Sequence, residues 1–253
     1  MLEALGLIIA GVCIASAAMA VGIGGGILWT PLLILAYGLS PQESVATSLM
    51  IQVVGMGSGT LAYMKAKLTQ IRLSLIFFAV ALPGVIIGGY LSVRLSQDMV
   101  QMMLGIMAMT VAVLFVAGQD QFVDTVKSAE SDRRKVRRLL PIPAFFGFMM
   151  GTLSVGIGEW LVPALRQRLN LDMRQAIATV IPVMFLLAIC ASAVHWSQTD
   201  GMRLNYFAYG AIGTFVGGQI GPRISQRIDE RMLKQSFIYL MTLIGIHMIF
   251  QAI

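Results

Sequence analysis

Apolar residues run along this chain in stretches of about twenty, and short polar segments separate the stretches. A helix needs about 20 apolar residues to cross the hydrocarbon core of a bilayer. Long apolar stretches occupy approximately residues 2–38, 41–63, 73–93, 98–117, 141–169, 173–196, 204–221 and 232–253. The pattern therefore predicts an all-α integral membrane protein with several transmembrane helices.

Two of these stretches are interrupted by glycine. Gly22, Gly24, Gly25 and Gly26 interrupt the first, and Gly156 and Gly158 interrupt a later one. Glycine destabilises a helix interior and leaves the backbone free to unwind. The apolar piece after the first interruption spans about 12 residues, which at ~1.5 Å per residue covers ~18 Å of a ~30 Å core. The sequence predicts a broken helix at each interruption.

The two halves of the chain carry similar residues in the same order. Matching pairs are Val21–Gly24 with Val155–Gly158, Pro31 with Pro163, Leu39 with Leu171, Ala46-Thr47 with Ala178-Thr179, Gly88-Gly89 with Gly217-Gly218, and Arg94–Gln97 with Arg223–Gln226. Several matches in order indicate an internal duplication. We expect a first repeat at residues 1–118, a basic linker at 119–138 and a second repeat at 139–253.

Basic residues predict how the chain is threaded through the membrane. Only 12% of the residues are charged, and the net charge of +6 is interpreted as topology rather than as a nucleic-acid surface. If both broken helices cross the membrane, the 18 Lys and Arg residues divide ten to eight between the two faces. If each broken helix is a hairpin that returns to its own side, the division is sixteen to two, with only Arg94 and Arg203 outside.

The positive-inside rule selects the hairpin arrangement. Each repeat is then a broken hairpin helix followed by three transmembrane helices, and the second repeat is inverted. Both termini are predicted to be periplasmic, and the linker is predicted to be cytoplasmic.

Inverted repeats with discontinuous helices are a recurring plan of secondary transporters, with the site where the breaks meet. Helix N-termini favour anions, and no Lys or Arg falls in the middle of a predicted span. Backbone N–H groups and hydroxyls are therefore expected to bind a small anion, with no metal and no cofactor. The candidate substrate-binding residues are Gly22, Gly24, Gly25, Gly26, Thr47, Ser48, Gln52, Gly156, Gly158 and Thr179. For Thr47 and Ser48 the alternative is packing between helices by small polar residues.

Glu159 is an acid inside an apolar stretch, directly behind the second glycine interruption. Acids at membrane depth are candidate functional groups. One interpretation is a proton-coupling group that competes with the anion or is neutralised with it. The other is a helix-capping acid that only occupies the second half of the site.

The run Gly22-Ile23-Gly24-Gly25-Gly26, then Pro31, then Ala46-Thr47-Ser48-Leu49, resembles the TauE/SafE family of membrane permeases over nearly the whole chain. The resemblance implies export of small anions, such as sulfite or organosulfonates like sulfoacetate, across the bacterial inner membrane. The chain departs from the family at Gly158-Glu159-Trp160, where members commonly keep glycines.

Other functions remain open at this point. A passive anion channel would use the same helix dipoles without needing Glu159. A cation transporter is disfavoured because acids are scarce within the spans, and no arrangement typical of an enzyme appears. The expected partners are a small anion and the lipid bilayer, and the sequence does not indicate an oligomeric state.

Overall fold

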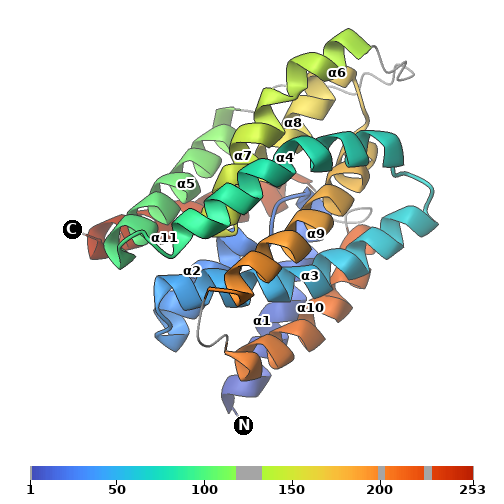
Figure 1. Ribbon diagram of the computed structural model, residues 1–253. Coiled ribbons are helices and arrows are strands. Elements are labelled where there is room, and N and C mark those ends of the chain that lie inside the picture. Colours follow the sequence, from blue (N-terminus) through green and yellow to red (C-terminus); the bar gives the residue numbers. More distant parts are fainter. Residues whose placement is uncertain (1, 118–132, 199–202, 225–229, 253) are drawn as a thin grey trace.

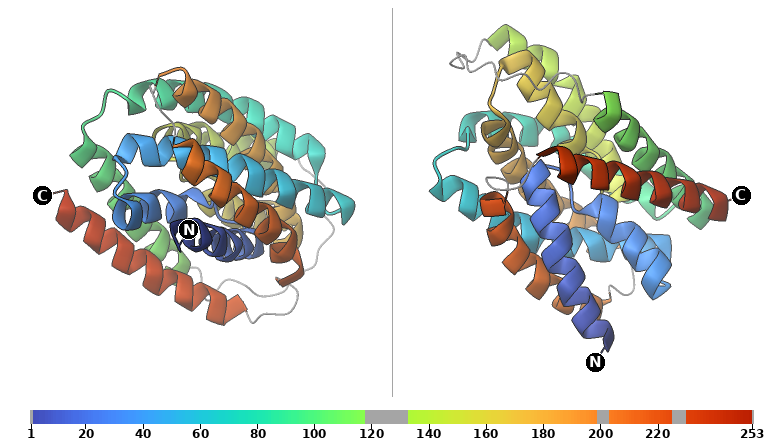
Figure 2. Two further views of the ribbon diagram at one scale, coloured as in Figure 1. Left: turned by 90° about the horizontal axis from the view of Figure 1, so that it is seen from below. Right: turned by 180° about the vertical axis from the view of Figure 1, so that it is seen from behind.

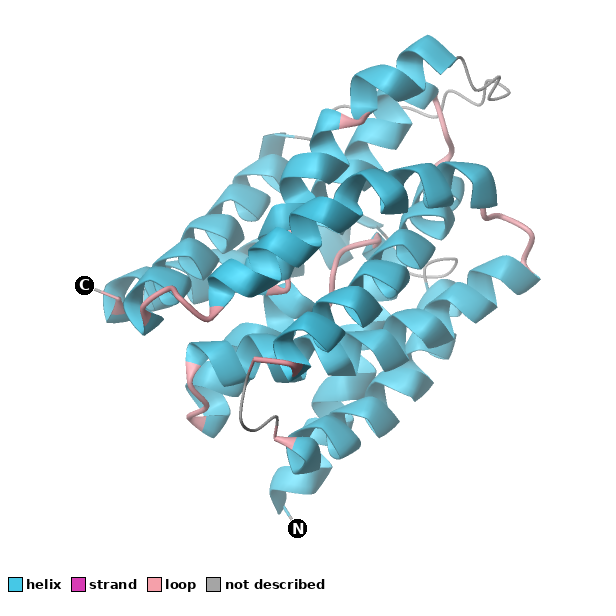
Figure 3. Ribbon diagram, in the orientation of Figure 1, coloured by secondary structure: helices cyan, strands magenta, loops and turns pink. Residues whose placement is uncertain are grey.

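The computed structural model describes residues 2–117, 133–198, 203–224 and 230–252. These residues form helices and short connections and contain no strand, which confirms the all-α prediction (Figures 1 and 3). The helices are α1 (Leu2–Val21), α2 (Gly26–Tyr37), α3 (Pro41–Lys65), α4 (Ile71–Ser92), α5 (Gln97–Ala117), α6 (Arg133–Leu139), α7 (Pro141–Leu153), α8 (Ile157–Leu169), α9 (Met173–Trp196), α10 (Leu204–Ile224) and α11 (Glu230–Gln251).

The expected helix breaks separate α1 from α2 and α7 from α8. In each case the residue after the helix adopts a left-handed backbone conformation, with φ of 81° at Gly22 and 66° at Ser154. This conformation ends an α-helix by turning the chain away from the helix axis. Both apolar stretches are therefore interrupted by a turn and not by a kink.

Each broken pair doubles back on itself. A Cβ atom placed on Gly6, near the start of α1, would lie 3.2 Å from the hydroxyl oxygen of Tyr37, the last residue of α2. In the other pair the Arg168 guanidinium, near the end of α8, donates a 3.1 Å hydrogen bond to the Arg138 carbonyl in α6, next to the start of α7. The start and the end of each pair thus lie together, as in a hairpin.

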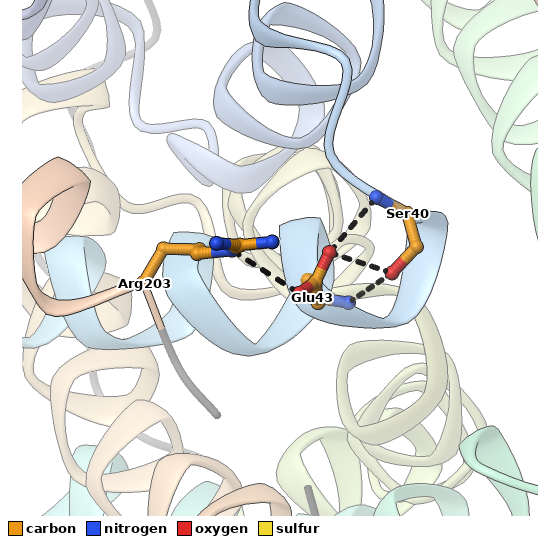
Figure 4. Close-up of polar contacts among 3 residues, drawn as sticks. All are labelled: Ser40, Glu43 and Arg203. Atoms are coloured by element: carbon orange, nitrogen blue, oxygen red, sulfur yellow. Dashed lines mark hydrogen bonds and ion pairs between the residues drawn. The ribbon is translucent and has the colours of Figure 1, made fainter. Parts of the chain in front are cut away.

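One end of the helix bundle is joined by side chains from both halves. Glu43 in the first turn of α3 accepts hydrogen bonds from the backbone N–H and hydroxyl of Ser40, and its other oxygen lies 3.2 Å from Nε of Arg203, just before α10 (Figure 4). The Gln42 amide donates to the Leu95 carbonyl, between α4 and α5.

These contacts bear on the threading of the chain. If the broken helices crossed the membrane, Glu43 and Arg203 would lie on opposite faces; the hairpin arrangement puts them on the same face. The ion pair therefore agrees with the hairpin arrangement, while the side of the membrane on which it lies stays a prediction. In Figure 1 the N-terminus and α6 lie at opposite ends of the molecule.

Five of the described helices are long and apolar enough to cross a membrane, judged by length and composition: α1, α3, α4, α5 and α9. The described part of α11 counts only as a shorter apolar helix, Met241–Gln251. Most of the expected linker at 119–138 lies outside the described residues, and its last part forms α6.

Helix packing is exchanged between the two halves of the chain. α1 packs along α10, and α7 packs along α4; α3 also contacts α10, and α9 also contacts α4 (Figure 2). α3 contacts α9, and α5 contacts α11, so these equivalent helices contact each other. Glycines permit the close approach, since a Cβ on Gly11 would lie 2.9 Å from Cα of Gly213, and one on Gly147 3.0 Å from Cα of Ala81.

Helix boundaries in the two halves follow a nearly constant spacing. α3 and α9 begin 132 positions apart (173 − 41), and the left-handed residues Gly38 and Asn170 that end α2 and α8 are also 132 apart. α4 and α10 begin 133 apart (204 − 71).

This spacing changes the residue matching expected from the sequence. The matches of Pro31, Leu39 and Ala46-Thr47 agree with the spacing of 132. The match of Val21–Gly24 with Val155–Gly158 is displaced by two residues, and the matches at Gly88-Gly89 and Arg94–Gln97 by four. By helix geometry Gly22 is equivalent to Ser154, Gly26 to Gly158, and Ile27 to Glu159.

Candidate functional site

The two helix breaks cross and touch each other inside the bundle. A Cβ atom on Gly26 would overlap the Ser154 carbonyl oxygen, and one on Gly158 would lie 2.8 Å from the Gly22 carbonyl oxygen. With the spacing of 132, these two contacts are equivalent. The breaks therefore pack reciprocally, and the absence of a side chain at Gly26 and Gly158 is what allows them to meet.

Glu159 reaches from the first turn of α8 into the other break. Its side chain is buried, with 1% exposed. Oε1 accepts a 3.0 Å hydrogen bond from the backbone N–H of Gly24, whereas Oε2 is buried with no hydrogen-bond partner among the described residues. A carboxylate from the second half of the chain thus lies on a backbone donor of the first half.

Polar side chains of α3 complete the surroundings of this carboxylate. The Gln52 amide nitrogen donates a 3.3 Å hydrogen bond to the Ser154 carbonyl and another to the Ser154 hydroxyl. The hydroxyls of Ser48 and Ser154 lie 3.1 Å apart. The Gln52 carbonyl oxygen would lie 3.8 Å from a Cβ placed on Gly24. We call Gly24, Ser48, Gln52, Ser154 and Glu159 the polar cluster.

Four members of the polar cluster were candidates from the sequence, and Ser154 was not. Ser154 directly precedes Val155-Gly156, so a small hydroxyl residue at the edge of the break was the available signal. Its left-handed backbone conformation turns its hydroxyl and carbonyl toward α3.

The other sequence candidates lie around the cluster or away from it. Gly22, Gly26 and Gly158 form the crossing itself, while Gly156, with φ of 129°, lies against Phe146, Met107 and Met149. Thr179 donates to the Gln175 carbonyl and accepts from the backbone N–H of Gln70, before α4. The Thr47 hydroxyl is buried and has no partner in the part of the chain that the structure describes. The structure does not bring these two threonines into the cluster.

The position equivalent to the polar cluster in the other half is apolar. Applying the spacing of 132, Ser48 corresponds to Val180, Gln52 to Met184, Glu159 to Ile27, Ser154 to Gly22, and Gly24 to Gly156. The Met184 sulfur lies beside Gly158, as the Gln52 amide nitrogen lies beside Gly26. We call these five residues the apolar mate. The same backbone crossing thus carries polar side chains on one side only.

A small cavity lies next to the polar cluster. Gly25, Trp29, Gln52 and Thr214 are among the residues that line it, and its volume is about 10 Å³. A cavity of that size holds about one water molecule. A cavity of that size is too small for an anion of several heavy atoms. Among the described residues no group of His, Cys, Asp and Glu is arranged to hold a metal ion.

Comparisons with known proteins agree over nearly the whole chain. Residues 7–248 match the family described as "Sulfite exporter TauE/SafE". The chain is 24% identical to the probable membrane transporter protein YunE of Bacillus subtilis, covering 98% of this chain and 97% of that protein. It is 26% identical to the probable membrane transporter proteins YjnA of Bacillus subtilis and y4hK of Sinorhizobium fredii, covering 81% and 89% of this chain and 85% and 89% of those proteins. No solved structure gives a significant match.

Proposed function

The chain belongs to the TauE/SafE family of membrane transporters, and we propose that it exports a small anion, such as sulfite or an organosulfonate like sulfoacetate, with the polar cluster as its binding site. The protein is a multi-pass membrane transporter and not an enzyme. We further propose that it resides in the bacterial inner membrane as two inverted repeats, with both termini periplasmic and the linker cytoplasmic.

The observation that carries the proposal is the carboxylate of Glu159 on the backbone N–H of Gly24. A carboxylate and a sulfonate or sulfite oxygen are acceptors of the same kind, so a donor that binds one also suits the other. The chain's own carboxylate thus occupies a donor at the helix break, where backbone N–H groups favour negative charge.

The other donors of the polar cluster match an oxyanion with several oxygens. The Gln52 amide supplies two N–H groups, and Ser48 and Ser154 each supply a hydroxyl. No Lys or Arg side chain belongs to the cluster. An anion held only by neutral donors keeps its charge uncompensated, which favours binding that is reversible rather than tight.

Competition for the Gly24 N–H suggests how a proton is coupled to transport. When the substrate takes this donor, Glu159 is left without a partner at membrane depth, which disfavours its charged form. Protonation of Glu159 would then accompany substrate binding. Opening of the hairpins toward one side and then the other would expose the site alternately, as in other transporters built from broken helices.

Flux of sulfite and sulfoacetate from proteoliposomes, with and without a pH gradient, tests the proposal. We expect saturable flux of at least one of these anions that a pH gradient accelerates. Glu159→Gln should retain flux but lose the response to the gradient, because glutamine carries no exchangeable acid proton. Glu43→Gln, the same change near the surface, is the control and should keep the response.

The outcomes separate the alternatives. Non-saturating flux without exchange would indicate a passive anion channel. An unchanged pH response of Glu159→Gln would contradict the coupling role and leave anion transport standing. No flux of either anion would overturn the proposed substrates.

A further inference from the structure

A groove at the α6 end of the bundle lies apart from the polar cluster. It has a volume of about 460 Å³ and runs between the start of α4 and α6. Its lining consists of Gln70, Ile71, Arg72, Leu73, Ile76, Val136, Arg137 and Leu140. Two cationic side chains therefore share the groove with five apolar ones.

The arginines of the groove are exposed and carry no ion pair among the described residues. No Asp or Glu in the described part of the chain lines the groove. The first turn of α4 contains no acidic residue, and the Gln70 side chain makes no capping hydrogen bond there. In the described part of the chain, the groove thus presents two positive charges and a helix start without a side-chain cap, and no negative group balances them.

Apolar side chains at the start of α4 are exposed, one of them in the groove. Ile71 has 54% of its surface exposed, and the neighbouring Leu75 has 53%. α4 is long and apolar enough to span the membrane, so we expect its first turns to lie where headgroups give way to acyl chains. On the other wall, α6 is fixed to the bundle by the buried side chains of Val136 and Leu139.

We propose that this groove is a binding site for an anionic phospholipid, whose headgroup phosphate is bound by Arg72 and Arg137 and whose acyl chains cover the apolar wall. A free phosphate or a soluble anion would bind the two arginines but would make no contact with the apolar side chains of the groove. The face that carries sixteen of the 18 basic residues in the hairpin arrangement is also the face where anionic lipids attract basic segments. A lipid bound there would contact both α6 and α4 and so connect these two helices.

Lipid binding to protein in nanodiscs tests this proposal independently of transport. Thermal unfolding is measured in phosphatidylcholine nanodiscs with increasing phosphatidylglycerol, and native mass spectrometry counts the lipids that stay bound. We expect phosphatidylglycerol to raise the melting temperature of the wild type. Inorganic phosphate added to pure phosphatidylcholine nanodiscs should not do so.

The double variant Arg72→Gln/Arg137→Gln should bind phosphatidylglycerol about thirtyfold more weakly, since each basic residue near an anionic surface contributes about 1 kcal/mol. Arg72→Lys/Arg137→Lys keeps the charge and should retain most of the binding. The control Lys65→Gln/Arg138→Gln removes two charges from the same end of the bundle outside the groove, and its binding should stay close to that of the wild type.

Equal weakening in the control and the groove variant would overturn the site, because it would indicate a general charge effect. Stabilisation by inorganic phosphate alone would overturn the lipid as the ligand. Neither result depends on which substrate is transported, so failure here leaves the proposed transport function unaffected.

Discussion

The polar cluster and the apolar mate are built on the same backbone crossing and differ in their side chains. Gly26 lies on the Ser154 carbonyl and Gly158 lies on the Gly22 carbonyl, so the close packing is present on both sides. Gln52 and Glu159 are polar where Met184 and Ile27 are apolar. The backbone geometry is thus common to both sides, while the polar side chains that we propose as the binding site are confined to one of them. We infer that each chain binds one substrate, away from the axis that would relate the repeats.

Substitution of the crossing glycines tests the shared part of this comparison and should have the largest effect. Gly26→Ala would drive a methyl group into the Ser154 backbone, which cannot move without separating the breaks. We expect a loss of about 3 kcal/mol or more of stability, as for other severe packing defects. The measurement is thermal unfolding of purified protein in detergent.

Gly25→Ala is the matched control for this change. The nearest atom to a Cβ at Gly25 is 3.5 Å away in Trp29, an ordinary contact, so the melting temperature should change little. Equal destabilisation by both substitutions would mean that the reciprocal contact of Gly26 is not what holds the breaks together.

Exchanging residues between the two sides tests the part that differs. Gln52→Met places in the polar cluster the methionine found at the equivalent position, Met184. It also removes the amide that donates to Ser154. We expect anion flux to fall about a hundredfold, equivalent to ~3 kcal/mol, with stability largely retained. Flux and thermal unfolding of the same preparation are compared.

The reverse change, Met184→Gln, should act on stability instead. The new amide would be buried beside apolar residues, at a cost of about 1–3 kcal/mol if it finds no partner. Its flux should stay within a few fold of the wild type. A large loss of flux in Met184→Gln with unchanged stability would indicate that the apolar mate also contacts the substrate.

The ion pair between Glu43 and Arg203 is a smaller difference between the halves. The equivalent positions, 175 and 70, are both glutamine, so this ion pair has no counterpart there. Arg203 is more than half exposed, and exposed ion pairs contribute about 0–1 kcal/mol. Arg203→Gln should therefore lower the melting temperature by a few degrees at most, and by less at high salt, in thermal unfolding scans. A larger loss that salt does not reduce would argue against a simple surface pair.

Hydropathy and glycine content were enough to predict both breaks and the helical segments other than α6, which lies in the expected linker, and to select the acid beside the second break as a candidate. The residue matching between halves was less accurate, because identical glycines were aligned with each other and glycine recurs often in this chain. Tyr63 and His195 are an equivalent pair that a search for identical residues does not find. They lie 132 positions apart, and their side chains bond the Met19 and Gly151 carbonyls, also 132 apart, at 2.8 Å each.

Only part of the candidate site was predicted from the sequence. Ser48, Gln52 and Gly24 were selected as donors near a break, and the structure brings them together with Glu159. Thr47 and Thr179 were selected as a matching pair, yet Thr179 bonds the start of α4. Ser154 was missed because its role depends on a left-handed turn, which sequence patterns rarely predict for serine.

The exchanged packing of α1 with α10 and of α4 with α7 has a consequence for biosynthesis. α10, the helix that covers α1, is among the last to be synthesised. Until then, the glycine-containing face of α1 is exposed to lipid. Contacts so distant in the chain form late and slowly. A ribosome that stalls before α10 is made would leave an incomplete protein in which α1 lacks the helix that covers it, and membrane quality control would act on such a chain.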